Sequence, residues 1–468
     1  MTQTIRQPES GWLSRLGLVG LAPIEAPVLA ALASEQPLLL IGPHGTAKSL
    51  LLTRVAAALG LTCRHYNASL LNFDDLVGFP VPGSHGSLEY LKTPAAIWGA
   101  GAVIVDEINR CRPDVQNKLF PIIHERKVQG LPLPDLRYRW AAMNPPCTEE
   151  EDRGYAGAEP LDRALADRFA FVVQMPAWTA FTRHEQLAVI QAEDRAVEPT
   201  DAAHLTQLLQ RVGALIPALK TELGNAVAEY VHVLVPLLAQ AGLDLSPRRA
   251  TLLYQAVLAV HASDLALDPT ATVADSALLA VRSCLPQRAE GIVVPEVKVL
   301  AAHREAVRSV RLRPDDPIRR ILATADPLER LRLAVRARRL PKGEYSRVVA
   351  DALVQMPAGA REAAVVHLFE TGAVGRLHAA VASQIGECYR DLATPAPFSE
   401  TLHASHSRYR TWGRIKDLLS RLNPEDPRAH LQANALASLF ARKQVQTPEE
   451  AERAFSAFAV TDEHLRQA

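Results

Sequence analysis

The residues best suited to chemistry begin in a loop that follows a short apolar run. In the sequence LLLIGPHGTAKS, the run Leu38–Ile41 is typical of a buried parallel strand. The loop after such a strand can turn its backbone N–H groups towards an anion at the start of the next helix. Gly42 and Gly45 permit that turn. Lys48 can reach the outer phosphates of a nucleotide, and the Ser49 hydroxyl can bind magnesium. The sequence therefore predicts an ATP-binding loop made of Gly42, Pro43, His44, Gly45, Thr46, Ala47, Lys48 and Ser49.

One position of this loop departs from the strict phosphate-binding pattern. That pattern places glycine immediately before the lysine, whereas this chain has Ala47. Because short patterns also occur by chance, a nucleotide site needs support from a second group of residues.

Two adjacent acidic residues supply that support. Residues 103–105 form another apolar run of the buried-strand type, and Asp106 and Glu107 follow it directly. Open α/β sheets bind ligands at the C-terminal ends of their strands. We therefore expect Asp106 to hold magnesium together with Ser49, and Glu107 to orient and deprotonate the attacking water. The alternative is a strand end that simply turns into solvent.

Composition limits the remaining classes of protein. A chain of 468 residues is long enough for two or three domains, and 51 Lys and Arg balance 51 Asp and Glu, so its overall charge does not favour nucleic acid. The five cysteines show no CxxC spacing, which fits a reducing compartment and does not suggest a zinc site. The first residues lack a signal pattern, and no apolar run approaches the length of a membrane span. We therefore expect a cytoplasmic protein without membrane insertion.

Further elements are expected to position these residues. Strands are expected over 63–67, 138–143 and 170–173, and helices over 22–34, 50–59 and 113–125. Glycine and proline suggest an insertion with a hairpin or bulge over 73–92, and a second hairpin is expected over 127–138. Later helices are expected over 204–215, 226–239, 249–262 and 274–284.

Read together, several segments resemble the MoxR family of AAA+ ATPases. These are GPHGTAKS, DLVGFPV, VIVDEINRCRPDVQNKLFPIIHERKV, AAMNPP and LDRALADRFAF. Family members commonly have alanine before the loop lysine, which accounts for Ala47. The resemblance implies an α/β P-loop AAA+ core, a parallel sheet flanked by helices, over residues 1–175. It also implies an all-α lid over 176–300, and a mostly α-helical C-terminal region over 301–468 completes the expected organisation.

The family pattern also implies roles for residues beyond the loop. Asn144 resembles the sensor-one asparagine that positions water near the γ-phosphate, although an asparagine before proline is also a common turn residue. Arg168 resembles the arginine finger that acts on the nucleotide of a neighbouring subunit, with Arg163 as a substitute. Without the family pattern, a surface salt bridge would be the ordinary interpretation of Arg168. An arginine supplied across an interface can be worth ~10³–10⁵ in rate, so hydrolysis would require assembly.

A second arginine is expected from the lid. Arg248 in Ser246-Pro247-Arg248 resembles the sensor-two arginine, with the adjacent Arg249 as an equally basic alternative. Arg248 is preferred because it matches the family pattern and because Pro247 can occupy the first turn of a helix.

The resemblance implies an ATP- and Mg²⁺-dependent hexameric ring that acts as a chaperone on a partner protein. Such partners commonly contain a von Willebrand factor A domain and are activated, loaded with a metal or assembled into a complex. We expect the loops at 73–92 and 127–138 to contact the partner, since loops on a rigid scaffold usually carry recognition.

Two other classes of function remain open. One is a nucleotide-gated regulatory scaffold with little turnover, against which Glu107 argues, since a binding-only module needs no water-activating glutamate. The other is a nucleic-acid motor, which only the basic run 301–347 supports, with 13 Lys and Arg against 6 Asp and Glu. That run is otherwise a solvated helix face or a docking surface for an acidic partner. The neutral overall charge counts against nucleic acid.

Overall fold

The computed structural model describes residues 11–82, 88–146, 158–192, 196–313, 315–394 and 407–467. The chain divides into two compact units, Met1–Val307 and Arg308–Ala468. The first unit holds every residue predicted above to take part in chemistry. The boundaries at 175 and 300 expected within the chain stay predictions.

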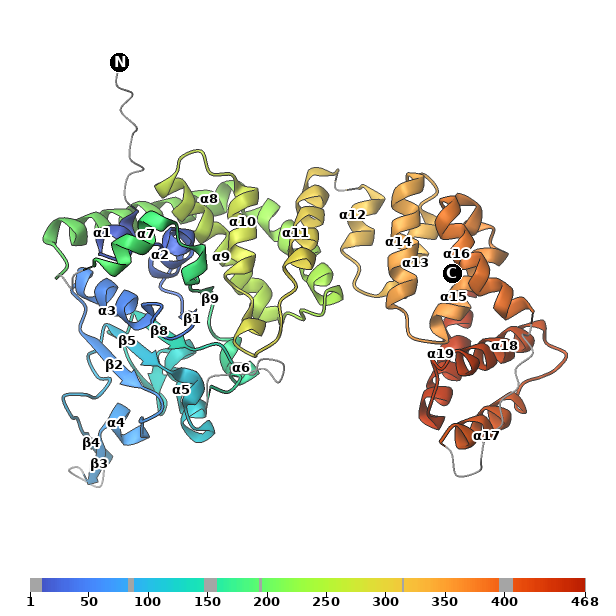
Figure 1. Ribbon diagram of the computed structural model, residues 1–468, viewed down its shortest axis with the longest axis horizontal. Coiled ribbons are helices and arrows are strands. Elements are labelled where there is room, and N and C mark those ends of the chain that lie inside the picture. The colour runs from blue at the N-terminus through green and yellow to red at the C-terminus, as the bar shows by residue number, and fades with distance from the viewer. Residues whose placement is uncertain are drawn as a thin grey trace, which may run out of the picture. The chain divides into compact units, whose positions relative to one another are not determined.

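The first unit is built on a five-stranded sheet in the order β2-β5-β8-β1-β9, in which every pair is parallel (Figure 1). Its strands are β1 (Leu38–Ile41), β2 (Cys63–Asn67), β5 (Ala102–Asp106), β8 (Tyr138–Met143) and β9 (Phe171–Gln174). Strand β8 lies between β1 and β5. The phosphate loop, Asn144 and Asp106 therefore leave three neighbouring strands at the same edge of the sheet.

Helices cover both faces of this sheet. Leu39, Val105 and Met143 share a core cluster with Leu119 of α5 (Pro113–Glu125) and Leu165 of α6 (Arg163–Ala166). Residues that alternate with them in the strands face the other side, which α2 (Glu25–Ala33) and α3 (Lys48–Ala58) contact. In Figure 1, α3 and α6 lie on opposite sides of the strands. This arrangement, with the mostly helical C-terminal region below, confirms the predicted fold class.

Two short hairpins extend from the sheet domain. The insertion at 73–92 forms helix α4 (Phe73–Val77), which was not predicted, and then the antiparallel strands β3 (Phe79–Pro82) and β4 (Leu88–Leu91). Residues 83–87 of this insertion lie outside the described residues. The second hairpin consists of β6 (Lys127–Val128) and β7 (Leu131–Pro132). Both predicted hairpins are therefore present.

The rest of the first unit is helical. It contains α1 (Trp12–Arg15), α7 (Arg183–Ile190), α8 (Pro199–Gln240), α9 (Pro247–Leu267), α10 (Val273–Arg282) and the start of α11 (Glu296–Arg311). The prediction of separate helices at 204–215 and 226–239 is wrong, because α8 is one helix of 42 residues with Pro217 and Pro236 inside it. A proline removes one helical hydrogen bond. Packing of α8 against α9, α2 and α3 extends along the helix and keeps it continuous.

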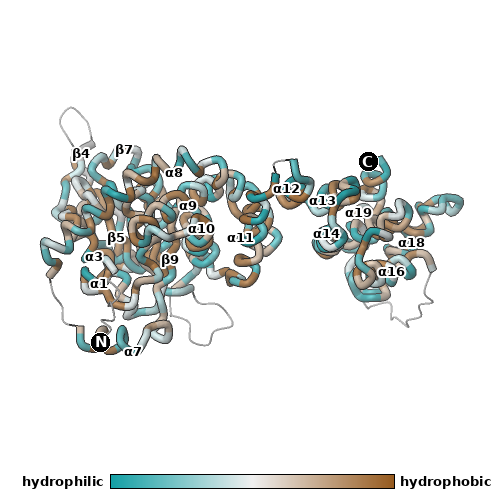
Figure 2. Tube along the Cα trace, turned by 90° about the horizontal axis from the view of Figure 1, so that it is seen from above, coloured by the Kyte–Doolittle hydropathy of each residue, from teal (hydrophilic) through white to brown (hydrophobic). Residues whose placement is uncertain are grey.

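Helix α9 is an exception to the expectation that no apolar run approaches the length of a membrane span. By length and composition it is apolar enough to cross a membrane, and it is the one such helix among the described residues. Its average hydropathy is high, although polar residues such as His261 interrupt the apolar ones in the sequence. In the structure α9 packs against α8, α2 and α10. Hydrophobic residues gather around β5, β9 and α9 in Figure 2, and 56% of the most apolar window of α9 is buried, as in a core helix.

The second unit consists of helices within the described residues. They are α12 (Pro317–Leu322), α13 (Pro327–Arg336), α14 (Lys342–Gln355), α15 (Ala360–Glu370), α16 (Ala379–Ala393), α17 (Ser407–Leu419), α18 (Pro427–Ala441) and α19 (Pro448–Arg466). One core cluster surrounds Tyr345 and Leu368, and a second surrounds Ile415 and Phe440. The mostly helical composition predicted for this region is confirmed.

Candidate functional site

The phosphate loop connects β1 to α3 and is held in an uncommon backbone conformation. Gly45 has a φ of +75° and Ala47 a φ of +61°, both in the left-handed region. An L-residue in that region costs roughly 1–2 kcal/mol, so glycine would be favoured at position 47. Ala47 is the N-cap of α3, which makes Lys48 and Ser49 the first two residues of the helix. The loop thus has the geometry of the predicted pattern although one glycine is replaced.

Lys48 ties the loop to the neighbouring strand end. Its Nζ donates hydrogen bonds to the carbonyl oxygens of Gly42 at 2.7 Å and Pro43 at 2.8 Å, and to Oδ1 of Asn144 at 3.1 Å. Burial lowers the pKa of Lys48, and the charges of Asp106 and Glu107 oppose that shift. The structure therefore brings Lys48 and Asn144, 96 residues apart in sequence, into direct contact.

The predicted magnesium ligands also meet. The Ser49 hydroxyl donates a hydrogen bond of 2.5 Å to Oδ2 of Asp106, and Nε2 of His65 lies 3.5 Å from the same oxygen. The Glu107 N–H donates to the other carboxylate oxygen at 2.9 Å. Burial raises the pKa of Asp106, but the hydrogen bonds from His65, Ser49 and Glu107 outweigh it, and the net pKa is lowered. Asp106 therefore stays an anion at neutral pH.

These oxygens fit a magnesium ion that accompanies a nucleotide. Mg²⁺ usually keeps several waters and takes one or two protein oxygens together with phosphate oxygens. Ser49 and Asp106 supply such a pair next to the loop. The described part of the chain contains no cluster of three or more His, Cys, Asp or Glu residues that could enclose a metal by itself.

Glu107 occupies a strained position directly after Asp106. Its φ is +52°, in the left-handed region that a residue with a side chain seldom adopts. Oε1 of Glu107 lies 3.6 Å from Nη1 of Arg110, one turn further along the chain. Strained backbone of this kind costs of order 1–3 kcal/mol and often occurs at active sites, where it aims a side chain.

A buried amide network, which the sequence did not predict, holds Asn144 in place. Nδ2 of Asn109 donates to the backbone oxygen of Asn144 at 3.3 Å and to that of Glu159 at 3.1 Å. The side chains of Asn109 and Asn144 are both buried. His65 lies in none of the segments that resemble the family and Asn109 lies in one of them, but their contacts with Asp106 and Asn144 are seen only in the folded chain.

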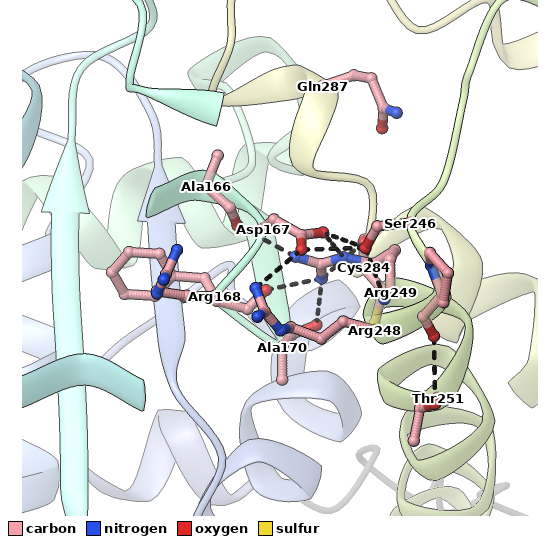
Figure 3. Close-up of polar contacts among 12 residues, drawn as sticks. Ala166, Asp167, Arg168, Ala170, Ser246, Arg248, Arg249, Thr251, Cys284 and Gln287 are labelled. Carbon is pink, nitrogen blue, oxygen red and sulfur yellow. Dashed lines mark hydrogen bonds and ion pairs between the residues drawn. The ribbon is translucent and has the colours of Figure 1, made fainter. Parts of the chain in front are cut away.

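The predicted arginines form a separate group (Figure 3). Arg168 follows α6, donates from Nη1 to the Ala164 carbonyl at 2.5 Å and lies over the ring of Phe120, 4.5 Å from its centroid. Nη1 of Arg248 lies 3.4 Å from Oδ2 of Asp167, and the Arg248 side chain is 43% exposed. Burial and then the charge of Arg248 lower the pKa of Arg168.

The structure distinguishes Arg248 from Arg249. Ser246 is the N-cap of α9 and Pro247 lies in its first turn, as predicted. Arg249 is only 1% exposed, and its guanidinium donates to backbone carbonyl oxygens of the sheet domain and of the helices beside it. Arg248 is the one of the two whose side chain remains accessible to a ligand.

The arginine group does not meet the phosphate loop within the described residues. The polar contacts found for Arg168 and Arg248 in the described chain are with Ala164 and Asp167. Arg163 and Arg248 line a cavity of about 380 Å³ together with acidic residues that include Asp162 and Glu290. The roles predicted for Arg163, Arg168 and Arg248 stay predictions.

A family model matches the part of the chain that contains this site. Residues 37–169 match the AAA domain of the dynein-related subfamily, a range that contains the phosphate loop, Arg168 and every strand of the sheet except β9. A solved structure from Cytophaga hutchinsonii, described as a candidate ATPase, is 19% identical over 64% of this chain and 92% of its own, with a TM-score of 0.41. No curated protein matches the chain. The family match thus lies within the first unit, over the part that carries the phosphate loop.

Proposed function

We propose that this chain is a MoxR-type AAA+ ATPase that hydrolyses ATP with Mg²⁺ only when neighbouring copies assemble into a ring. The observation that carries this proposal is the separation of two sets of residues. Lys48, Ser49, Asp106 and Asn144 converge at one edge of the sheet. Arg168 lies elsewhere, next to α5 and α6. A copy that offers Arg168 to its neighbour would add this arginine to the phosphate site, where Arg110 of the same chain already lies beside Glu107.

Each residue then has a distinct task. Lys48 and the loop N–H groups hold the phosphates, and Ser49 and Asp106 hold the magnesium ion. Bound Mg²⁺ and ATP supply the phosphoryl chemistry itself. Glu107 takes the proton of the attacking water, which Asn144 orients. Arg168 from the neighbour stabilises the charge of the transition state, and Arg248 assists from the lid.

The proposed product of this cycle is a remodelled partner protein in the cytoplasm. Phe79, Leu91 and Leu131 are large apolar side chains exposed on the two hairpins. Tyr90 of one hairpin hydrogen-bonds Gln129 of the other, which makes the hairpins one surface. This surface suits transient contact with a client, proposed to contain a von Willebrand factor A domain and to be activated, loaded with metal or assembled.

Light scattering after size exclusion tests the assembly. The Glu107→Gln variant, which should bind MgATP without consuming it, is expected to form a particle of six protomers of 51.0 kDa each. Without nucleotide the same variant should form a particle of lower mass, with fewer protomers. A variant that stays monomeric with bound MgATP, while the wild type hydrolyses ATP as a monomer, would contradict the ring. Binding of ATP without turnover in an assembled ring would favour the regulatory scaffold instead.

A further inference from the structure

Arg249 joins the arginine-bearing turn of the sheet domain to the helices that follow it. Nη1 of Arg249 donates to the carbonyl oxygens of Phe169 at 2.7 Å and Ala170 at 3.3 Å, and Nη2 donates to that of Ala166 at 3.1 Å. These carbonyls lie on both sides of Arg168. The buried guanidinium of Arg249 thus hydrogen-bonds the backbone of the turn that carries Arg168 (Figure 3).

The same guanidinium reaches a third part of the fold. Nη1 also donates to the carbonyl oxygen of Cys284, just after α10, at 3.2 Å. Nε lies 3.4 Å from Oδ1 of Asp167, whose carboxylate also accepts hydrogen bonds from the Ser246 hydroxyl and pairs with Arg248. One buried residue therefore links α9, the end of α10 and the Arg168 turn.

Burying a guanidinium is costly, and well-packed apolar residues often serve stability equally well. An ionic group in such a place can instead fix one arrangement of the parts that it joins. Arg249 donates hydrogen bonds to carbonyl oxygens of two backbone segments. Any rotation of α9 relative to the sheet would break these bonds unless the Arg168 turn moved with it.

We propose that Arg249 is a positioning residue that makes the Arg168 turn and the start of α9 one rigid body. Motion of the lid in one copy then moves the arginine offered to the next copy. This inference rests on the proposed function, since it concerns how Arg168 is presented to a neighbour. It predicts that loss of Arg249 acts like loss of Arg168.

Mixed rings test this directly. Glu107→Gln copies keep the arginine turn, whereas Arg168→Ala copies keep the phosphate site, so a 1:1 mixture should hydrolyse ATP faster than either variant alone. Arg249→Met is expected to lower kcat by about 10²-fold, the scale of a 1 Å misplacement, with a KM for ATP within about twofold of wild type. Mixed with Glu107→Gln copies, it should regain activity as Arg168→Ala does.

Two further measurements separate positioning from simple loss of structure. In the Arg168→Ala background, Arg249→Met should lower kcat by no more than about twofold, because the residue through which it acts is already absent. Arg249→Lys, which keeps the charge but cannot reach several carbonyls at once, should lie between wild type and Arg249→Met.

The outcomes distinguish the two proposals. If the Arg168→Ala and Glu107→Gln mixture is active while the Arg249→Met and Glu107→Gln mixture is not, the positioning role is wrong and the ring proposal stands. If neither mixture is active, the trans-acting arginine itself is wrong, and this inference falls with it.

A second inference concerns the C-terminal unit and does not depend on hydrolysis. Residues 308–468 contain 25 Lys and Arg against 19 Asp and Glu, a net charge of +6 that residues 1–307 cancel in the whole chain. Arg338 and Arg339 are exposed in the turn between α13 and α14, Lys342 is exposed at the first position of α14, and no ion pair of these three is found within the described residues. The nearest acids, Glu329 and Glu344, are paired with other arginines.

Hydrogen bonds from Arg376 hold the backbone at the start of this turn. Arg376 donates to the carbonyl oxygens of Val335 and Ala337, each at 2.7 Å, and its guanidinium lies 3.9 Å from the centroid of the Tyr345 ring. The three cations are therefore presented on a rigid support, which reduces the entropy lost on binding.

We infer that this turn docks an acidic segment of a partner protein. Arginine forks match carboxylates, and residues 336–342 contain no aromatic side chain on which a nucleic-acid base could stack. A fluorescent octaglutamate peptide should bind the full chain, and changing all three cations to glutamine should weaken binding by about tenfold.

The matched control changes three exposed cations elsewhere in the unit, Lys416, Arg421 and Lys443, to glutamine, and should weaken binding by less than about twofold. Equal weakening by both triple variants would overturn the inference. Tighter binding of a thymidine octanucleotide than of the peptide at the same ionic strength would overturn it in favour of nucleic acid.

Discussion

The Ser49 hydroxyl lies 2.5 Å from Oδ2 of Asp106, although 57 residues separate them in sequence. One stands in the first turn of α3 and the other at the end of β5. Their contact places two oxygen atoms beside the phosphate loop, which is the basis of the proposed magnesium site.

Removing either oxygen should therefore weaken the binding of MgATP in particular. Ser49→Ala and Asp106→Asn are each expected to lower the affinity for MgATP by about 10–100-fold, the usual effect of disturbing a metal site. Affinity for ATP in excess EDTA should change much less. Titration calorimetry with and without Mg²⁺ measures both, and equal losses in the two conditions would speak against a metal role.

Glu107→Gln should separate binding from hydrolysis. The amide keeps the size of the side chain but cannot accept a proton from water, so kcat should fall by about 10²–10⁴-fold while the Kd for MgATP stays within about twofold. Asp135→Asn, an exposed change between β7 and β8, serves as the control for lost charge. Steady-state phosphate release by Glu107→Gln at the wild-type rate would exclude Glu107 as the base.

The left-handed backbone at Ala47 makes a prediction about stability. Ala47→Val puts a β-branched residue at a φ of +61° and should destabilise the loop by about 1–3 kcal/mol and weaken nucleotide binding. Ala47→Gly removes the strain at the cost of a more flexible unfolded chain, so its free energy of unfolding should stay within about 1 kcal/mol of wild type. Urea unfolding compares the three proteins, and tolerance of valine would contradict the loop geometry.

Two buried histidines in the helices after the sheet should make stability depend on pH. His261 accepts or donates a hydrogen bond with Ser276 at 3.0 Å, and His303 does so with Tyr230 at 2.8 Å. Burial lowers the pKa of both from the ordinary 6.5. The folded state thus binds fewer protons than the unfolded state, and stability should fall as pH drops through 6.5.

Glutamine variants isolate this effect. Raised pKa values at the buried Glu25 and the half-buried Asp264 and Glu290 act in the opposite sense, since the folded state binds their protons more readily. The His261→Gln and His303→Gln double variant should therefore lose less stability between pH 7.5 and 6 than wild type does. Identical pH profiles of the free energy of unfolding would refute the assignment.

Local pattern was sufficient for much of the sheet domain. The bounds of β1 and α5 follow from an apolar run and from Pro113, because buried parallel strands are uniformly apolar and proline favours a first helical turn. The predicted bounds of β2 and β8 also match, although these strands contain Arg64 and Arg139. Long-range packing limited the prediction elsewhere. Helix α8 continues through Pro217 because its neighbours support it, which no local pattern shows.

The same limit applies to the site. Motifs identified the loop, the acids and Asn144, which the fold brings together. His65 and Asn109 contribute through neighbours in space, and no sequence pattern assigned either of them a role. The sequence also left Arg248 and Arg249 as alternatives, since burial separates two adjacent arginines only once α9 packs on the sheet domain.

The central claim is that hydrolysis needs an arginine from a second copy. Steady-state MgATP hydrolysis per protomer, measured over a wide range of protein concentration for wild type and Arg168→Ala, tests it most directly. We predict that wild-type specific activity rises with concentration to a plateau, and that Arg168→Ala binds ATP but remains about 10³-fold or more slower at every concentration. Specific activity that is independent of concentration, together with an active Arg168→Ala variant, would contradict the account.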